Sequence, residues 1–292
     1  MCYNKPTSMK ERAFIMKKFF ALLLAALMAV TLFAACGETA APTDTGAVAP
    51  TKAKLIMATN ANFPPYEFKD GADAEIVGID AEIAAKIAEK LDMELEIVDT
   101  EFGSIIGGVQ SGKFDIGMAG MTVTEERKES VNFTDSYAKG IQSVIVKADS
   151  DVTSFEDFYT GFDEEGNPTG VKEGVKIGVQ ADTTGDIYAS DEPANWGFGE
   201  DNVVSFKNGA DAVQALVSDK VTCVIIDNEP AKNFVAANDG LKILDGAYAD
   251  EDYAICVNKS NTDLLNKINA ALAELKADGT IAQIVEKYIP AE

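Results

Sequence analysis

The sequence predicts an α/β fold that begins near Lys52 and continues to the C-terminus. Two observations support this prediction: short apolar segments of strand length recur along the chain, and amphipathic helical segments lie between them. Strands that alternate with helices favour βαβ units and largely parallel sheets. About 240 residues suffice for one large domain or for two small ones.

The first half of this region alternates strand and helix patterns. A strand is expected at 54–59, and a helix follows from about Asp80. One face of that helix is apolar because branched and small residues recur at spacings of three and four. These residues are Ile83, Ala84, Ile87, Ala88 and Leu91. The pattern then predicts a strand at 94–99, a helix at 102–111 and a strand at 114–119.

The second half repeats the pattern and ends in helices. Strands are expected at 143–147, 175–179, 221–226, 241–244 and 253–257, with helices at 184–189, 209–219 and 229–238. Two final helices, 262–277 and 280–288, are separated by Asp278-Gly279, which is a helix-stop signal. A polar, glycine-containing run at 159–170 predicts a hairpin-like excursion.

The first 35 residues have the composition of an export signal. Lys17-Lys18 precede an apolar run at 19–35, and small residues close that run. We therefore expect a signal peptide at 1–35, with Met16 as an alternative translation start. An uncleaved transmembrane helix is the other interpretation of the apolar run.

Cys36 directly follows two alanines, an arrangement that resembles a bacterial lipobox. Phe33 departs from the leucine usual three places before such a cysteine. The expectation is a lipid on Cys36 and a flexible tether at 36–51, because that run is small, polar and aperiodic. The mature protein would then be held at the outer face of the bacterial cell membrane, which in a Gram-negative cell is the periplasmic side.

Composition excludes several classes of function. The net charge of −23 repels phosphate backbones and anionic lipid, so nucleic acid is not an expected partner. The chain has no histidine, the commonest general base and a usual metal ligand, so neither a metal nor another cofactor is expected. Cys223 and Cys256 lie in apolar strand patterns and are expected to be buried free thiols, with a disulfide as the alternative.

The segment 118–127 follows a buried-strand pattern and contains a glycine, the hydroxyl of Thr122 and the guanidinium of Arg127. An Arg fork beside hydroxyl and backbone N–H donors suits a small carboxylate. Asp227 follows the strand at 221–226 and could accept an ammonium group. Together these features describe a site for the α-carbon end of a free amino acid. The alternative is a capping box made by Thr122 and Glu125, with Arg127 as a solvated helix charge.

From about residue 54 to its end, the chain resembles the extracellular solute-binding protein family 3, polar amino-acid-binding proteins of bacterial ABC importers. Four segments in order carry the resemblance, at 58–68, 77–80, 118–127 and 178–185, and Asp227 follows them. It implies a type II periplasmic-binding-protein-like fold, in which two lobes, each a mixed, mostly parallel sheet flanked by helices, are joined by two crossovers. Carried onto this chain, lobe 1 is 52–138 plus 253–292, lobe 2 is 139–252, and the crossovers lie near 137–141 and 249–253.

The resemblance also implies the residues that bind a ligand between the lobes. The α-carboxylate would contact Arg127, Thr122 and the Gly120 amide of lobe 1. It would also contact the helix start after Gln180 in lobe 2, at Thr183 and Thr184. The α-ammonium would be held by Asp227 and the carbonyl near Ala119.

Two aromatic residues, Phe63 and Phe102, match positions that sandwich the ligand side chain in such proteins. Asn60 stands where the family often has Asp, and an amide carries no charge. This departure favours a neutral polar ligand over a basic one. Buried carboxylates would weaken that preference, and the candidates are Glu67, Glu101 and Glu229.

The expected function is capture of a free L-amino acid and its delivery to ABC permease subunits by a monomeric, non-enzymatic binding protein, with lipid as its only membrane attachment. Two alternatives stay open. Secreted dehydratase-like enzymes resemble the same fold, and a ligand-bound form could instead signal to a membrane receptor.

Overall fold

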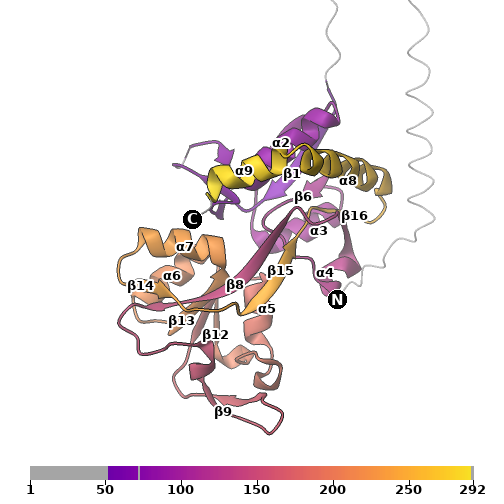
Figure 1. The fold of residues 1–292 in the computed structure, drawn as a ribbon. Coiled ribbons are helices and arrows are strands. Elements are labelled where there is room, and N and C mark those ends of the chain that lie inside the picture. The colour runs from indigo at the N-terminus through magenta and orange to yellow at the C-terminus, as the bar shows by residue number, and fades with distance from the viewer. Residues whose placement is uncertain (1–51, 72, 291–292) are drawn as a thin grey trace, which may run out of the picture. The chain divides into compact units, whose positions relative to one another are not determined.

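The computed structural model describes residues 52–71 and 73–290. The predicted signal peptide, the lipidated Cys36 and the tether all lie outside these residues. Within them the chain forms two mixed α/β lobes, as predicted, each with a central sheet (Figure 1). The expectation that each sheet is mostly parallel is wrong, because two of the four strand pairings in the first sheet and three of the five in the second are antiparallel. None of the helices in this part of the chain is both long and apolar enough for a bilayer crossing.

The first sheet has the strand order β5-β1-β6-β16-β7. Its strands are β1 (Lys54–Thr59), β5 (Glu94–Asp99), β6 (Ile116–Gly117), β7 (Val131–Phe133) and β16 (Cys256–Asn258). β1 is parallel to β5 and β6, and β16 is antiparallel to β6 and β7. A small antiparallel sheet beside it holds β2 (Asn62–Phe63), β3 (Glu67–Lys69) and β4 (Ile76–Val77).

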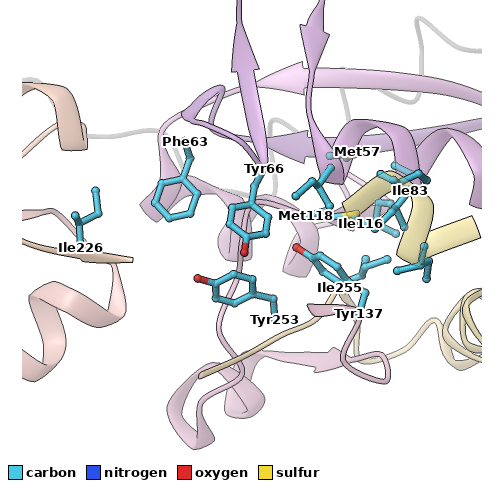
Figure 2. Packing of buried hydrophobic residues seen from close by; sticks show 14 of the residues in the cluster. Met57, Phe63, Tyr66, Ile83, Ile116, Met118, Tyr137, Ile226, Tyr253 and Ile255 are labelled. Carbon is cyan, nitrogen blue, oxygen red and sulfur yellow. The ribbon is translucent and has the colours of Figure 1, made fainter. Parts of the chain in front are cut away.

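Helices cover both faces of the first sheet. One group is α2 (Ile79–Lys90), α8 (Thr262–Ala277) and α9 (Thr280–Tyr288); on the other face lie η1 (Phe102–Ser104) and α3 (Ile105–Gln110). The apolar face predicted for α2 is buried with β1, for example at Ile83 and Met57. Figure 2 shows this core, together with Tyr66, Tyr137 and Tyr253 beside it.

The second sheet has the order β12-β11-β13-β8-β14, with β15 also paired to β8. Its strands are β8 (Ala138–Lys147), β11 (Ile177–Gln180), β12 (Val203–Phe206), β13 (Cys223–Asp227), β14 (Leu241–Ile243) and β15 (Ala249–Tyr253). Its helices are α5 (Thr184–Ser190), α6 (Gly209–Val217) and α7 (Asn228–Ala237), with short turns η2 (Phe155–Phe158), η3 (Pro193–Asn195) and η4 (Glu200–Asn202). The predicted excursion is a hairpin of β9 (Tyr159–Phe162) and β10 (Pro168–Val171).

Two strands connect the lobes. β8 carries the chain into the second sheet, and β15 brings it back toward β16 (Figure 1). They pair antiparallel, with Ala138 opposite Tyr253 and Gln142 opposite Ala249. These are the two expected crossovers, although the lobe boundaries at 138/139 and 252/253 stay a prediction.

The two cysteines of the folded region are buried free thiols, as predicted. Cys223 is in β13 of the second sheet, whereas Cys256 is in β16 of the first. Each thiol packs in the apolar core of its own sheet.

Candidate functional site

A narrow cavity lies between the lobes. Every ligand-binding residue expected from the sequence lines it, and Glu67 lines it as well. Lobe 1 contributes Asn60, Phe63, Glu67, Phe102, Ala119, Gly120, Thr122 and Arg127, and lobe 2 contributes Gln180, Thr183, Thr184 and Asp227. Their contact with a ligand stays a prediction.

Arg127 is on α4 (Glu125–Ser130) and is only 7% exposed. Its Nη1 donates to the carbonyl of Thr122 at 2.8 Å, and its Nη2 donates across the lobes to the carbonyl of Asp182 at 3.1 Å. The guanidinium also lies 5.3 Å from the centre of the Phe102 ring. Burial lowers the pKa of Arg127, but a guanidinium stays protonated in proteins. Among the described residues it forms no ion pair.

The capping-box alternative for Thr122 is wrong. α4 begins at Glu125, and its N-cap is Thr124, whose hydroxyl accepts from the backbone N–H of Arg127 at 3.1 Å. The Thr122 hydroxyl instead lies 3.4 Å from the Thr184 hydroxyl of the opposite lobe. The two hydroxyls therefore converge at the cavity that Arg127 lines.

The structure differs from expectation at two other carboxylate contacts. The Gly120 N–H donates to the Asp80 carboxylate at 2.8 Å and is not free for a ligand. Gly120 adopts φ +52°, and a side chain there would strike the Phe63 ring. The Thr183 hydroxyl is the N-cap of α5 and also donates to the Gln180 carbonyl at 2.8 Å. Of the two threonines, Thr184 has the more available hydroxyl.

Asp227 ends β13 at the opposite side of the cavity and is 5% exposed. The Tyr253 hydroxyl donates to its Oδ1. Burial raises the pKa of Asp227 well above its usual range, and the neighbouring Glu251 raises it further. No Lys or Arg in the described part of the chain forms an ion pair with it.

Two amides meet across the cleft. Gln180 Nε2 donates to Asn60 Oδ1 at 3.0 Å, while Asn60 Nδ2 donates to the carbonyl of Thr100 at 2.8 Å. Phe63 is nearly buried and packs on Tyr66, with ring centres 6.0 Å apart. This part of the cavity offers amide groups and aromatic surface.

The sequence offers Glu67 only as one of three candidates for a buried carboxylate near the ligand. In the structure it is 1% exposed and lines the cavity. Both of its carboxylate oxygens lack a hydrogen-bond partner among the described residues. Burial, followed by the charge of Asp80, raises its pKa well above the usual range. The signal that could have revealed it is strand pairing, since Glu67 lies directly opposite Phe63 in the β2–β3 hairpin.

Glu101 and Glu229, the other two carboxylates considered, do not line the cavity. Glu101 instead reaches across the lobes to Lys207 at 3.0 Å, and Glu229 pairs with Lys232 on α7. In residues 52–71 and 73–290 no group of three or more His, Cys, Asp or Glu side chains has the geometry of a metal site.

The family model of bacterial extracellular solute-binding proteins, family 3, matches residues 55–291. The chain belongs to this family. Within it, the chain is 31% identical to the arginine-binding extracellular protein ArtP of Bacillus subtilis, over 95% of this chain and all of ArtP. It is 30% identical to the glutamine-binding protein GlnH of the same organism, over 95% of this chain and all of GlnH.

The chain is also 37% identical to a solved structure, the P235GK mutant of ArgBP from T. maritima. The match covers 82% of this chain and 96% of that one, with a TM-score of 0.71. The family's two-lobed fold is therefore the fold of this chain. As a member of an extracellular solute-binding family, it is a binding protein of the ABC-transporter type.

Proposed function

We propose that this protein captures a free polar L-amino acid between its lobes and delivers it to the permease of an ABC importer. The observation that carries the proposal is a pair of buried, opposite charges on one cavity. Arg127 from lobe 1 and Asp227 from lobe 2 both line it, and neither has an ion-pair partner within the described residues. A zwitterion supplies the missing partner of each.

The α-carboxylate is assigned to the free guanidinium donors of Arg127 and to the hydroxyls of Thr122 and Thr184. Two of the guanidinium N–H groups are already used, so the side chain is held in place before the ligand arrives. Charge-assisted bonds of this kind are about twice as strong as neutral ones. The α-ammonium is assigned to Asp227, which then binds as a carboxylate.

The two ends of the ligand are assigned to different lobes, so ligand binding favours closure of the lobes. Contacts from both lobes are complete only when the lobes meet, so a ligand that bridges them favours the closed form by that difference in affinity. Direct bonds between lobes assist, including Gln180 with Asn60 and Lys207 with Glu101. The closed form is the state that we expect a permease to recognise.

Arginine is the first candidate ligand, and glutamine is the second. The relatives do not support the preference for a neutral ligand that Asn60 predicts, because ArtP is named for arginine and ArgBP has a solved arginine-bound form. The lining also favours a cation, because it holds two buried acids, Glu67 and Asp227, and a nearby positive charge stabilises the ionised form of either one. Glutamine stays a candidate because GlnH is similar and because Asn60 and Gln180 present amides.

We infer no catalytic role. The relatives named above are binding proteins, and the buried acids of this cavity are accounted for by binding a cationic group. A dehydratase would turn over prephenate or arogenate, and we expect no aromatic product from either compound. If the protein instead signals to a membrane receptor, the receptor would bind the same closed form.

The site of action is proposed to be the outer face of the cell membrane, with the monomer held by a lipid on Cys36. Replacement of this thiol, Cys36→Ser, would release the protein from the membrane fraction if the lipid is the anchor. Continued membrane retention of Cys36→Ser would refute the anchor.

A thermal-shift screen of the mature protein against the twenty amino acids, ornithine and cystine tests the proposed function. A ligand at 100 times its dissociation constant stabilises the fold by about 2.7 kcal/mol. We expect arginine or glutamine to raise Tm most, and Arg127→Ala to remove the shift. Absence of a shift with every compound would overturn the proposal.

A further inference from the structure

A second buried acid, Glu251, lies behind Asp227 and does not line the cavity. It is 5% exposed and sits on β15, one of the two crossovers. The pairing register shows on which face of the sheet the Glu251 side chain lies. Gln142 of β8 lies opposite Asp227 on one side, and Glu251 lies opposite Gly140, two residues away along β8. Residues directly opposite, and residues two apart, share a face of a sheet, so Asp227, Gln142 and Glu251 lie on the same face.

The hydrogen bonds around this cluster do not satisfy both acids. Gln142 Nε2 donates to Glu251 Oε2 at 3.0 Å, and the Tyr253 hydroxyl donates to Asp227. Glu251 Oε1 is buried and has no donor within the described residues. Gln142 links the two acids on this face, because it lies opposite Asp227 and hydrogen-bonds to Glu251. Two ionised carboxylates have only acceptors, so a bond between them requires a proton.

Gly140 provides the space that this arrangement needs. A side chain at this position would overlap the Tyr253 ring, because its Cβ would lie 2.2 Å from the hydroxyl oxygen. The Tyr253 ring therefore passes over the crossover strand β8 and brings its hydroxyl to Asp227. The whole cluster is built on the strands that join the lobes.

Few of the charged groups near the cluster formed by Asp227, Gln142, Glu251 and Tyr253 are cationic. The nearby titratable groups come from α4, α5 and the segment around β3. They are Arg127, Tyr188, Tyr66 and Glu67, and Asp80 of α2 and Glu229 of α7 lie near Tyr66. Only the guanidinium is cationic in this set, and it forms no ion pair with either acid. Burial and the adjacent Glu251 raise the pKa of Asp227.

We propose that Glu251 is a positioning residue for the ammonium site: it shares a proton with Asp227 in the ligand-free protein, and ligand binding expels that proton to solvent. The inference rests on the proposed function, in which Asp227 receives the α-ammonium. The ammonium then replaces the shared proton as the counter-charge of the pair. Amino-acid binding is thereby coupled to the release of a proton from the pair that includes Glu251 of the crossover strand β15.

The sign of the pH dependence follows from the direction of proton movement. Because the bound form carries fewer protons than the free form, affinity rises with pH. If one proton is released, affinity increases roughly tenfold per pH unit below the titration of the pair. It levels off once the pair is ionised without ligand.

Calorimetry with L-arginine and L-glutamine as probes, at pH 7 in phosphate and in Tris, measures the protons released. We expect close to one proton per ligand in the wild type. Glu251→Gln keeps the side-chain shape and an acceptor for Gln142, removes the neighbouring charge and can donate to Asp227. It should release fewer than half as many protons and bind with a flatter pH profile. Asp250→Asn is the matched control, since it removes the same charge from an exposed position on the same strand.

Wild-type proton release in Glu251→Gln, or the same loss in Asp250→Asn, would overturn the inference. Carbon-13 NMR of the Asp and Glu carboxyl groups tests it without any ligand. The Asp227 signal should be that of a protonated acid at pH 7 in the wild type, and Asp227 should ionise at a lower pH in Glu251→Gln. Ionisation of both Asp227 and Glu251 in the ligand-free wild type at pH 7 refutes proton sharing. Failure of both probes to bind the wild type would count against the proposed ligands, and the NMR result would still decide the proton.

Discussion

Arg127 and Asp227 line one cavity from opposite lobes, and Glu251 and Tyr253 of the return crossover lie behind the acid. Closing the lobes without a ligand leaves the buried Arg127 guanidinium without an ionic partner in the described residues, which is costly. This arrangement makes the ligand a structural component of the closed state and yields four predictions.

Arg127→Ala should weaken amino-acid binding by about 2–5 kcal/mol, because the ligand carboxylate loses the guanidinium donors that pair with it in a buried site. Isothermal calorimetry with the best ligand of the screen measures this loss. Lys128→Ala is the matched control, since Lys128 is the next residue on α4 and pairs only with Glu125 on the surface. Wild-type affinity in Arg127→Ala would remove this residue from the site.

Asp227→Asn should stabilise the ligand-free protein while abolishing ligand binding. The pKa of Asp227 is raised in the folded state, so the native protein binds more protons than the unfolded chain at intermediate pH. The contribution is therefore present in full below about pH 4 and is lost as pH rises toward the raised pKa. The variant should be more stable than the wild type at pH 8, and the two should be almost equally stable at pH 4.

Thermal unfolding of the ligand-free Asp227→Asn protein at both pH values measures this difference. Asp239→Asn is an exposed lobe 2 control that should change Tm at neither pH. A variant less stable than the wild type at pH 8 would contradict the prediction.

Asn60→Asp should shift selectivity toward arginine. The variant keeps an acceptor for Gln180 Nε2 and adds a negative charge to a position that is 7% exposed. It loses the bond to the Thr100 carbonyl, which affects both ligands equally. We expect the ratio of arginine to glutamine affinity to rise about tenfold, measured by calorimetry, since one buried charge pair contributes 1–2 kcal/mol or more. Asn62→Asp, on the exposed side of β2, should leave the ratio unchanged.

Asp80→Ala should destabilise the lobe 1 side of the cavity. Asp80 accepts from the Gly120 N–H at 2.8 Å and from the Tyr137 hydroxyl at 2.9 Å, and burial raises its pKa to about 6. Removal of this acceptor leaves two buried donors unpaired, at a cost of about 2–4 kcal/mol in urea unfolding. Asp80→Asn keeps one acceptor oxygen and should lose less than half as much. Equal losses in the two variants would show that hydrogen bonding at Asp80 is not the cause.

Sequence patterns were sufficient for the order of elements and for the residues that converge on the cavity. The long apolar helix α2 and the buried strands have clear periodicity, and a fixed motif places Thr122 and Arg127 beside each other. Other details depend on distant contacts. The backbone N–H of Gly120 donates to Asp80, forty residues earlier, and is therefore not free for a ligand. No local sequence pattern predicts this hydrogen bond. Glu67 turns inward through pairing of β2 with β3, strands of two and three residues that are too short to show a period.

The antiparallel pairing of β8 with β15 has a consequence for protein engineering. Because Ala138 lies directly opposite Tyr253, the two ends of the segment 139–252 leave lobe 1 at neighbouring points of one ladder. A corresponding segment from another relative can be grafted there with two adjacent junctions and without a redesigned linker. Such chimeras would recombine the carboxylate-holding half of one transporter protein with the ammonium-holding half of another.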